Sequence, residues 1–333
     1  MSSVTLTALV VVATFVASCI GTRALVALLQ RAAVLDLPNE RSSHTAPTPR
    51  GGGIAAVAAI SAAWAVFCAA GVLAPAGLVV TAGMVGLAAV SWIDDLRGLP
   101  AGLRLLAQFI GVAAGIWALP GSPVFQGLLP PGADAVAGAL IWVWFVNLFN
   151  FMDGIDGIAG SEAAAIGIGL VVIAGFGIGR DPDIAALGAA TAAAALGFLV
   201  WNWAPAKIFL GDAGSVPLGY VLGFLLLELA GRGWWRAALI LPLYFFADAS
   251  LTLLRRLLRG ERVWQAHREH FYQRAVQRGL GHDAVVLRMI AADAILIGCA
   301  GAAESGWGFA ALGVAALTVV LLLVELGRSR RRA

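Results

Sequence analysis

Long apolar segments follow one another through nearly the whole of this sequence. Eleven of them come close to the roughly 20 residues that an α-helix needs to cross a bilayer. Charged residues make up only 12% of the chain, too few to cover the surface of a water-soluble protein. The sequence therefore predicts an all-α, polytopic integral membrane protein with about 11 transmembrane helices, near 4–29, 54–73, 76–93, 104–120, 133–151, 158–179, 184–202, 216–231, 237–255, 285–303 and 308–327.

The basic residues predict how these helices are oriented. Eighteen Lys and Arg residues fall in one set of alternate loops and in the C-terminal tail, whereas the other set holds only Arg180, Arg232 and Arg236. Cytoplasmic loops carry the excess of basic residues. We therefore expect the N-terminus outside and the C-terminus in the cytoplasm. The net charge of +3 reflects this bias, and we expect no nucleic-acid partner.

The chain shows no composition shift that would divide it, so we expect a single transmembrane domain over residues 1–333. The first apolar segment has no basic region before it, and we interpret it as a retained helix rather than a signal peptide. The three cysteines lie in apolar segments without metal-binding spacing, so neither a disulfide nor a zinc site is implied. Cytoplasmic loops are expected near 30–53, 94–103, 152–157, 203–215 and 256–284.

Acidic residues gather on the predicted cytoplasmic side. Acids in or beside membrane helices are costly and need a partner, water or a function. The positive-inside rule does not require them to cluster, so the clustering suggests a site for a metal ion and a polyanionic substrate. The acids concerned are Asp36, Glu40, Asp94, Asp95, Asp153, Asp156, Asp212, Asp248, Glu261, Glu269 and Asp283.

The pair Asp94-Asp95 directly follows a predicted span. Two adjacent carboxylates ionise together at low cost only beside a cation. Mg²⁺ prefers carboxylate oxygens and keeps water and phosphate oxygens as its other ligands. The alternative is a solvated pair balanced by Arg97 and Arg104.

Asn147, Asn150 and Asp153 recur every three residues in an otherwise aromatic and aliphatic stretch. This spacing places them on roughly one side of a helix end, where they lose hydration without obvious local partners. Gly154, which precedes Asp156 by two residues, would let the backbone approach a ligand closely. The alternative is polar contact between helices.

Asp212 lies among small residues in a segment that we expect to be a loop leading into a helix. A metal ion and a diphosphate could approach it there, and Lys207 supplies a positive charge for phosphate. Ser215 could cap the next helix, whose N-terminus also favours anions. An ordinary turn with an Asp or Ser cap is the alternative.

The last long loop carries His267, Arg268, His270 and Arg274. If it is helical, His267, His270 and Arg274 share one face, which would suit phosphate. The spacing of the histidines is not that of a zinc protease. A structural amphipathic helix at the membrane surface is the alternative.

The first long loop combines Arg41, His44 and Arg50 with prolines and a run of three glycines. Prolines and glycines hold an irregular loop, and basic side chains near glycine amides suit anion binding. A basic cytoplasmic loop without a binding role explains this segment equally well.

These five segments, in this order over residues 36–274, resemble the polyprenyl-phosphate N-acetylhexosamine-1-phosphate transferases of glycosyltransferase family 4. The resemblance implies a Mg²⁺-dependent enzyme, with Mn²⁺ as a substitute, that joins a UDP-N-acetylhexosamine to undecaprenyl phosphate among the membrane lipids. It also implies a location in the bacterial inner membrane, an active site on the cytoplasmic face and, by analogy, a homodimer.

The resemblance also implies roles for individual residues. Asp212 corresponds to the metal ligand, and Asp94 and Asp95 to a catalytic pair at the lipid-phosphate end. Asp153 joins them as a catalytic residue of the active-site wall. The remaining matched positions are expected to bind substrate: Asn147, Asn150, Asp156, Asn202, Lys207, His267, Arg268, His270, Arg274, Arg41, His44 and Arg50.

The last loop distinguishes branches of the family. Its pattern from His267 to Arg274 resembles the branch that initiates O-antigen with UDP-FucNAc, UDP-QuiNAc or related sugars, rather than the phospho-MurNAc-pentapeptide translocases. A secondary transporter of an anionic solute is the main alternative, because intramembrane acids and broken helices fit that class. A CDP-alcohol phosphotransferase is disfavoured, because its Ala-Arg dipeptide is absent after Asp153-Gly154.

Overall fold

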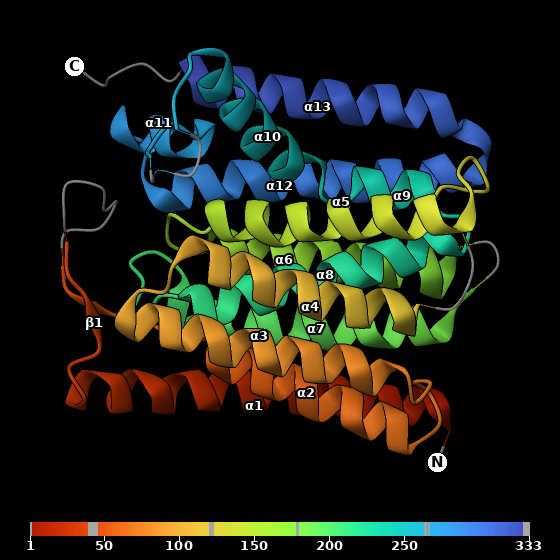
Figure 1. Ribbon diagram of the computed structural model, residues 1–333, viewed down its shortest axis with the longest axis horizontal. Helices are drawn as coiled ribbons and strands as arrows, with labels where there is room; N and C mark the ends of the chain where they lie inside the picture. The colour runs from red at the N-terminus through yellow and green to blue at the C-terminus, as the bar shows by residue number, and fades with distance from the viewer. Residues whose placement is uncertain are drawn as a thin grey trace.

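The computed structural model describes residues 2–38, 46–119, 123–177, 180–262, 265 and 267–328. Nearly all of its regular structure is helical, and Figure 1 shows long helices packed side by side along one axis. The elements are α1 Ser3–Arg31, β1 Leu35–Asp36, β2 Thr48–Pro49, α2 Gly53–Ala69, α3 Gly77–Arg97, α4 Ala101–Ala118, α5 Pro131–Phe151, α6 Ile158–Leu170, η1 Val171–Phe176, α7 Pro182–Asn202, α8 Asp212–Gly231, α9 Trp235–Ile240, α10 Leu243–Leu258, α11 Phe271–Gln277, α12 His282–Ala302, η2 Ala303–Trp307 and α13 Gly308–Arg328.

The prediction of an all-α polytopic membrane protein is confirmed. Among the described residues, eight helical stretches are long and apolar enough to cross a membrane. One of them, His282–Arg328, turns back at η2, so that α12 and α13 lie side by side (Figure 1). The helix α1 begins at one end of the bundle and α13 ends at the other (Figure 1). The exact number of spans and their orientation stay predictions.

One predicted span is broken. The segment 237–255 forms two helices, α9 and α10, which meet at Leu241 and Pro242. Proline lacks the N–H that a continuous helix needs and clashes with the preceding turn. Proline alone does not decide the outcome, because Pro217 lies in the first turns of α8 without breaking that helix. Pro217 is the sixth residue of α8, so it removes one helical hydrogen bond, but the helices packed around α8 hold that helix in place.

The helix α8 lies at the centre of the bundle. Almost every one of its side chains is buried, and it packs against α2, α3 and α5. A helix that is apolar on all sides is stable only when other helices surround it. Its first turn meets α2 so closely that a side chain at Gly53 would lie 2.2 Å from the Cα atom of Gly214. The surrounding helices thereby converge on the N-terminus of α8.

The short polar elements lie together at one end of the bundle. Figure 1 shows β1 and α11 at the end where α3 leads into α4 and α5 leads into α6. The strands β1 and β2 pair antiparallel, and Arg50 forms a bridge to Phe209 just before α8. The segments that the sequence singled out therefore come to one end of the molecule.

Candidate active site

Arg50 joins two carboxylates that are far apart in the sequence. Its Nη2 atom lies 2.8 Å from Oδ1 of Asp95 and 3.0 Å from Oδ1 of Asp212. Asp95 also accepts hydrogen bonds from the backbone N–H groups of Asp212 (3.2 Å) and Ala213 (3.0 Å). An acceptor at this position satisfies N–H groups at the start of α8 and complements the helix dipole. Asp95 thus caps a helix to which it does not belong.

Asp212 is the first residue of α8, rather than part of the loop that the sequence suggested. Gly211 precedes it with φ +73°, and a side chain at Gly211 would lie 2.8 Å from Oδ2 of Asp95. Ser215 lies inside the first turn and bonds to the carbonyl of Gly211 (3.2 Å), so the prediction that it caps the helix is wrong. A glycine fits where the backbone must turn and a carboxylate must approach it closely.

Arg104 forms an ion pair with Asp94, the other member of the acidic pair. Its Nη1 atom lies 3.0 Å from Oδ2 of Asp94 and 3.8 Å from Oδ2 of Asp212. Two arginines therefore balance three carboxylates, which leaves a local charge of one negative unit if all are ionised. The expected balance by Arg97 and Arg104 is right for Arg104, whereas Asp95 pairs with Arg50.

The two asparagines of α5 face different partners. Asn150 donates to Oδ1 of Asp212 (3.1 Å) and to Oγ of Ser215 (2.8 Å), which ties α5 to the start of α8. Asn147 donates to Oε1 of Gln108 on α4 at 2.6 Å. Asn150 therefore belongs to the carboxylate cluster, and Asn147 extends it toward α4.

Asp153 lies just beyond the end of α5 and is half-buried. Burial raises the pKa of its carboxyl to about 7, and the negative charge of Asp212 acts in the same direction, against the positive charge of Arg50. Among the described residues its carboxyl has no hydrogen-bond or ion-pair partner. A group with a pKa near neutrality and no fixed partner is suited to accept or donate a proton.

A cavity of about 180 Å³ opens beside these groups. Sequence reasoning missed Gln108 and Ser91 in its wall and considered Arg104 only as a counter-charge. Helical spacing offered a signal, because Arg104 and Gln108 are four residues apart and share one face of α4. The lining residues are Leu87, Val90, Ser91, Asp94, Ala101, Arg104, Leu105, Gln108, Asn147, Asn150, Phe151, Asp212 and Val216.

Three expected binding residues have other neighbours. Asn202 is buried and links loops, accepting from the N–H of Gly157 (2.9 Å) and donating to the carbonyl of Ile208 (2.9 Å). Asp156 accepts from the N–H of Ala206 (3.1 Å) and lies 3.3 Å from Nδ1 of His282. These contacts hold loops together, whatever further role the side chains have in binding.

Lys207, the third of these residues, is exposed and lies over the ring of Trp201, with Nζ 5.1 Å from the ring centre. Such an arrangement is a cation–π contact. Its expected contact with phosphate stays a prediction.

The last loop is not one helical face. The helix α11 starts only at Phe271, so His267 and His270 precede it while Arg274 lies within it, and the predicted common face is wrong. His270 is buried and its Nδ1 lies 3.2 Å from Asp248. Burial lowers the pKa of His267 to about 4, so that imidazole is neutral near pH 7. Its expected contact with phosphate stays a prediction.

The structure describes only some of the remaining predicted binding residues. Arg268 lies in the irregular stretch before α11. Arg41 and His44 lie outside the described residues. Their expected roles, like that of Arg274, stay predictions.

The acidic residues are compatible with a hard divalent ion that substrate phosphates help to hold. The described residues contain no group of three or more His, Cys, Asp or Glu side chains arranged to bind a metal. Mg²⁺ commonly uses one or two carboxylates and takes its other ligands from water and phosphate. Asp212, which lines the cavity with its carboxylate partly exposed, fits such a partial site.

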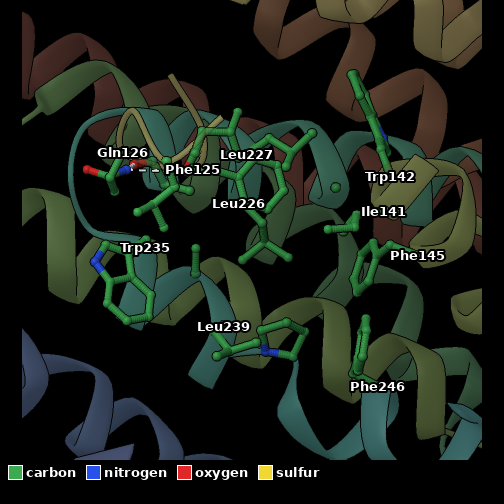
Figure 2. Close-up of a pocket in the computed structure, with 16 residues that line it drawn as sticks. Phe125, Gln126, Ile141, Trp142, Phe145, Leu226, Leu227, Trp235, Leu239 and Phe246 are labelled. Carbon is green, nitrogen blue, oxygen red and sulfur yellow. Dashed lines mark hydrogen bonds between the residues drawn. The ribbon is translucent and has the colours of Figure 1, made fainter. Parts of the chain in front are cut away.

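An apolar cavity of about 480 Å³ lies elsewhere along α5. Figure 2 shows Trp142, Phe145 and Phe246 along one side and Trp235 on the other, with Leu226 of α8 among the side chains between them. None of the described residues that line it is charged. It shares no lining residue with the cavity beside Asp212, but both cavities have walls on α5 and α8.

Comparison with known proteins places this arrangement in a family. The family described as glycosyl transferase family 4 matches residues 77–230, from α3 to α8. A decaprenyl-phosphate N-acetylglucosaminephosphotransferase of Mycobacterium tuberculosis is 30% identical over 301 residues, which cover 78% of this chain and 73% of the relative. A probable undecaprenyl-phosphate N-acetylglucosaminyl 1-phosphate transferase of Bacillus subtilis is 27% identical, with 83% and 80% covered.

A phospho-N-acetylmuramoyl-pentapeptide-transferase of Mycobacterium avium is also similar, at 32% identity over 272 residues that cover 68% of this chain and 74% of the relative. The two kinds of relative match to a similar degree, so overall identity does not separate the branches. The matched region holds the acidic pair of α3, the asparagines of α5 and the first turn of α8. This chain belongs to glycosyl transferase family 4.

Proposed function

We propose that this protein transfers N-acetylhexosamine-1-phosphate from a UDP-sugar to undecaprenyl phosphate and releases UMP. The reaction would begin a lipid-linked cell-envelope polysaccharide at the cytoplasmic face of the bacterial inner membrane. The observation that carries the proposal is the joining of Asp94, Asp95 and Asp212 by two arginines beside a cavity at one end of a membrane bundle. The names of the relatives support the same class of reaction.

The chemistry follows from charge. An oxygen of the lipid phosphate attacks the β-phosphorus of the UDP-sugar, and the bond from that phosphorus to the oxygen of UMP breaks. Phosphoryl transfer depends chiefly on positioning and on offsetting negative charge. Arg104 in the cavity wall and Arg50 beside Asp212 supply fixed positive charge, and Mg²⁺ held by Asp212 and the diphosphate would supply the rest.

Asp153 is the carboxyl best suited to take the proton of the lipid phosphate. Asp94 and Asp95 were the first candidates, but each forms an ion pair with an arginine and would lose that contact on taking up a proton. Asp153 has no such partner among the described residues, and its pKa is about 7. Asp94 and Asp95 then orient the arginines and the start of α8. A two-step path through a carboxylate nucleophile is the rival mechanism.

The apolar cavity of Figure 2 is a candidate site for part of the lipid chain. It has aromatic and aliphatic walls, and its helices α5 and α8 also carry Asn150 and Asp212. The phosphate end of a polyprenyl chain could then lie at the carboxylates while its tail runs along the same two helices. A short-chain polyprenyl phosphate should therefore be a poorer substrate than the undecaprenyl form.

The test is UMP release by the purified protein in detergent with undecaprenyl phosphate, Mg²⁺ and a panel containing UDP-GlcNAc, UDP-FucNAc and UDP-QuiNAc. Asp212→Ala should lower the rate about 1,000-fold, because it removes charge-matched ligation at the transferring phosphate. Its thermal unfolding should remain a single transition, which controls for misfolding. Release that needs both lipid and metal would identify the sugar. Failure of every UDP-sugar to bind or react would contradict the transferase.

Secondary transport of an anionic solute is the second candidate. The observation that favours it is a buried pair of acids, Glu162 on α6 and Asp293 on α12, inside the bundle and without hydrogen-bond partners among the described residues. Intramembrane acids mark ion pathways in transporters. Counterflow of a labelled anion in proteoliposomes, without UMP release, would favour this candidate.

A further inference from the structure

Asp248 on α10 is fully buried, yet it accepts hydrogen bonds from the start of α11. Its Oδ1 accepts from the backbone N–H of Phe271 (3.0 Å), and its Oδ2 accepts from that of Tyr272 (3.3 Å). Nδ1 of His270 lies 3.2 Å from the same Oδ1. One carboxylate therefore serves three polar groups of the segment that enters α11.

The carboxylate is also held on its own helix. The hydroxyl of Tyr244 lies 3.4 Å from Oδ2, and the hydroxyl of Thr252 lies 3.3 Å from Oδ1, each four residues away. A buried carboxylate is tolerable only when donors surround it. Asp248 and its neighbours thus form a closed polar network that fixes α11 to α10, at the end of the bundle shown in Figure 1.

Tyr272 carries this attachment to the loop of Asp153. Its hydroxyl donates to the carbonyl of Phe151 at 3.1 Å. It also fills the space beside Gly154, where an added side chain would begin only 2.2 Å from the tyrosine oxygen. Phe151 and Gly154 flank Asp153 in the chain. The position of α11 therefore decides where the backbone around Asp153 lies.

We propose that Asp248 is a positioning residue for the transfer reaction, which acts through Tyr272 on the loop that carries Asp153. The inference rests on the proposed function. Asp248 cannot touch substrate, because it is fully buried. Its effect must pass through the segment it holds, and a displacement of about 1 Å at a reacting group can cost up to about 100-fold in rate.

The chain offers a matched control at the other end of α5. Asp134 is also buried, and it accepts from the backbone N–H groups of Val124 (3.0 Å) and Phe125 (2.9 Å). Asp134→Asn and Asp248→Asn therefore remove the same charge from the same kind of contact. Both should lose thermal stability, but only one is linked to the Asp153 loop.

The experiment measures kcat and KM for the UDP-sugar and for the lipid in both variants and in Tyr272→Phe. Asp248→Asn should lower kcat about tenfold and leave the KM for lipid within twofold. Asp134→Asn loosens Val124 and Phe125 of the apolar cavity, so it should raise the KM for lipid and leave kcat within twofold. Adding Tyr272→Phe to Asp248→Asn should cost little more, because contacts in one chain of interactions are not additive. Hydrogen exchange of residues 151–157 should accelerate in Asp248→Asn and not in Asp134→Asn.

The outcomes separate the inference from the function. Equal kcat values in Asp248→Asn and Asp134→Asn, or multiplying effects of Asp248→Asn and Tyr272→Phe, would overturn the positioning role. If Asp248→Asn does not fold, Tyr272→Phe alone must still lower kcat and accelerate exchange at 151–157. An inactive wild-type protein would count against the proposed function, while unchanged exchange at 151–157 would overturn the attachment itself.

Discussion

Two groups of acidic residues in the described part of the chain differ in their cationic partners. At the start of α8, Asp95 and Asp212 share Arg50. Between α6 and α12, Glu162 and Asp293 are 0% and 3% exposed, and none of their carboxyl oxygens has a hydrogen-bond partner in the described part of the chain.

The difference shows what a carboxylate needs in order to act as an ionised group inside a membrane protein. Burial of an unpaired charge costs several kcal/mol, and an arginine with hydrogen bonds offsets much of that cost. The group at α8 also lies at a cavity, where arginines and carboxylates can exchange partners with a bound diphosphate. Neither Glu162 nor Asp293 is among the described residues that line the cavity beside Asp212.

Among the changes that test this difference, removing Arg50 should have the largest effect on activity. Arg50→Gln leaves Asp95 and Asp212 without their shared cation, as the second pair is now. We expect kcat/KM to fall about 100-fold, since loss of Arg50 leaves the nearly buried charge of Asp95 uncompensated and removes positive charge beside Asp212. Arg50 is 35% exposed, so the loss of stability should be smaller than for a fully buried pair.

The measurement is the rate of UMP release, with thermal unfolding of the same preparation as control. Arg50→Lys keeps the charge but has no planar fork for two carboxylates, and it should recover only part of the rate. Activity of Arg50→Gln within threefold of the wild type would contradict the view that this cation organises the site.

The sequence predicted the helices well because membrane-spanning length and apolar content are local properties. It also found most of the acids at α8, because polar residues stand out in an apolar background. It could not show that Arg50 bridges Asp95 and Asp212, since those contacts join α8 to segments more than 100 residues away. Glu162 went unnoticed, because one acid hardly changes the hydropathy of a long apolar segment.

Side-chain direction was the other limit of sequence reasoning. Lys207 and Asp212 are five residues apart, but Lys207 lies over Trp201 while Asp212 faces the cavity. His270 was expected to face phosphate and instead contacts Asp248. Such directions depend on where a helix begins and on what packs beside it, and neither is written in the spacing of the motif.

Neutralising Glu162 and Asp293 should change the unfolding temperature only slightly, and upward rather than downward. Glu162→Gln with Asp293→Asn removes two ionisable groups and keeps their shape. Even a buried ion pair can often be replaced by hydrophobic residues of similar volume with a gain of about 0–4 kcal/mol, and two acids without a cation have less stabilisation to lose. We expect the double variant to unfold at an equal or higher temperature in detergent and to keep UMP release within threefold of the wild type.

The matched contrast is Asp95→Asn, which neutralises a carboxylate that does have a cationic partner. It should lower both the unfolding temperature and the activity, because it weakens the contact with Arg50 and with the first turn of α8. Loss of stability in the Glu162 and Asp293 double variant as large as that in Asp95→Asn would remove the distinction between the two groups. It would also favour the transporter hypothesis, in which such a pair of acids binds the coupled ion.

The smallest expected effect concerns His267, in the irregular stretch before α11. Burial holds the pKa of His267 at about 4, below its ordinary value of 6.5, so the folded state binds fewer protons than the unfolded state between these values. Its contribution to stability is therefore complete above pH 6.5 and is lost as the pH falls toward 4.

His267→Gln should reduce the loss of stability between pH 7 and pH 5 by less than about 1 kcal/mol, because the ring is only partly shielded from solvent. Thermal unfolding at the two pH values measures this difference, and activity at pH 7.5 should stay within twofold because the imidazole is already neutral there. A large loss of UDP-sugar binding in His267→Gln at pH 7.5 would instead make this ring a direct ligand of the substrate.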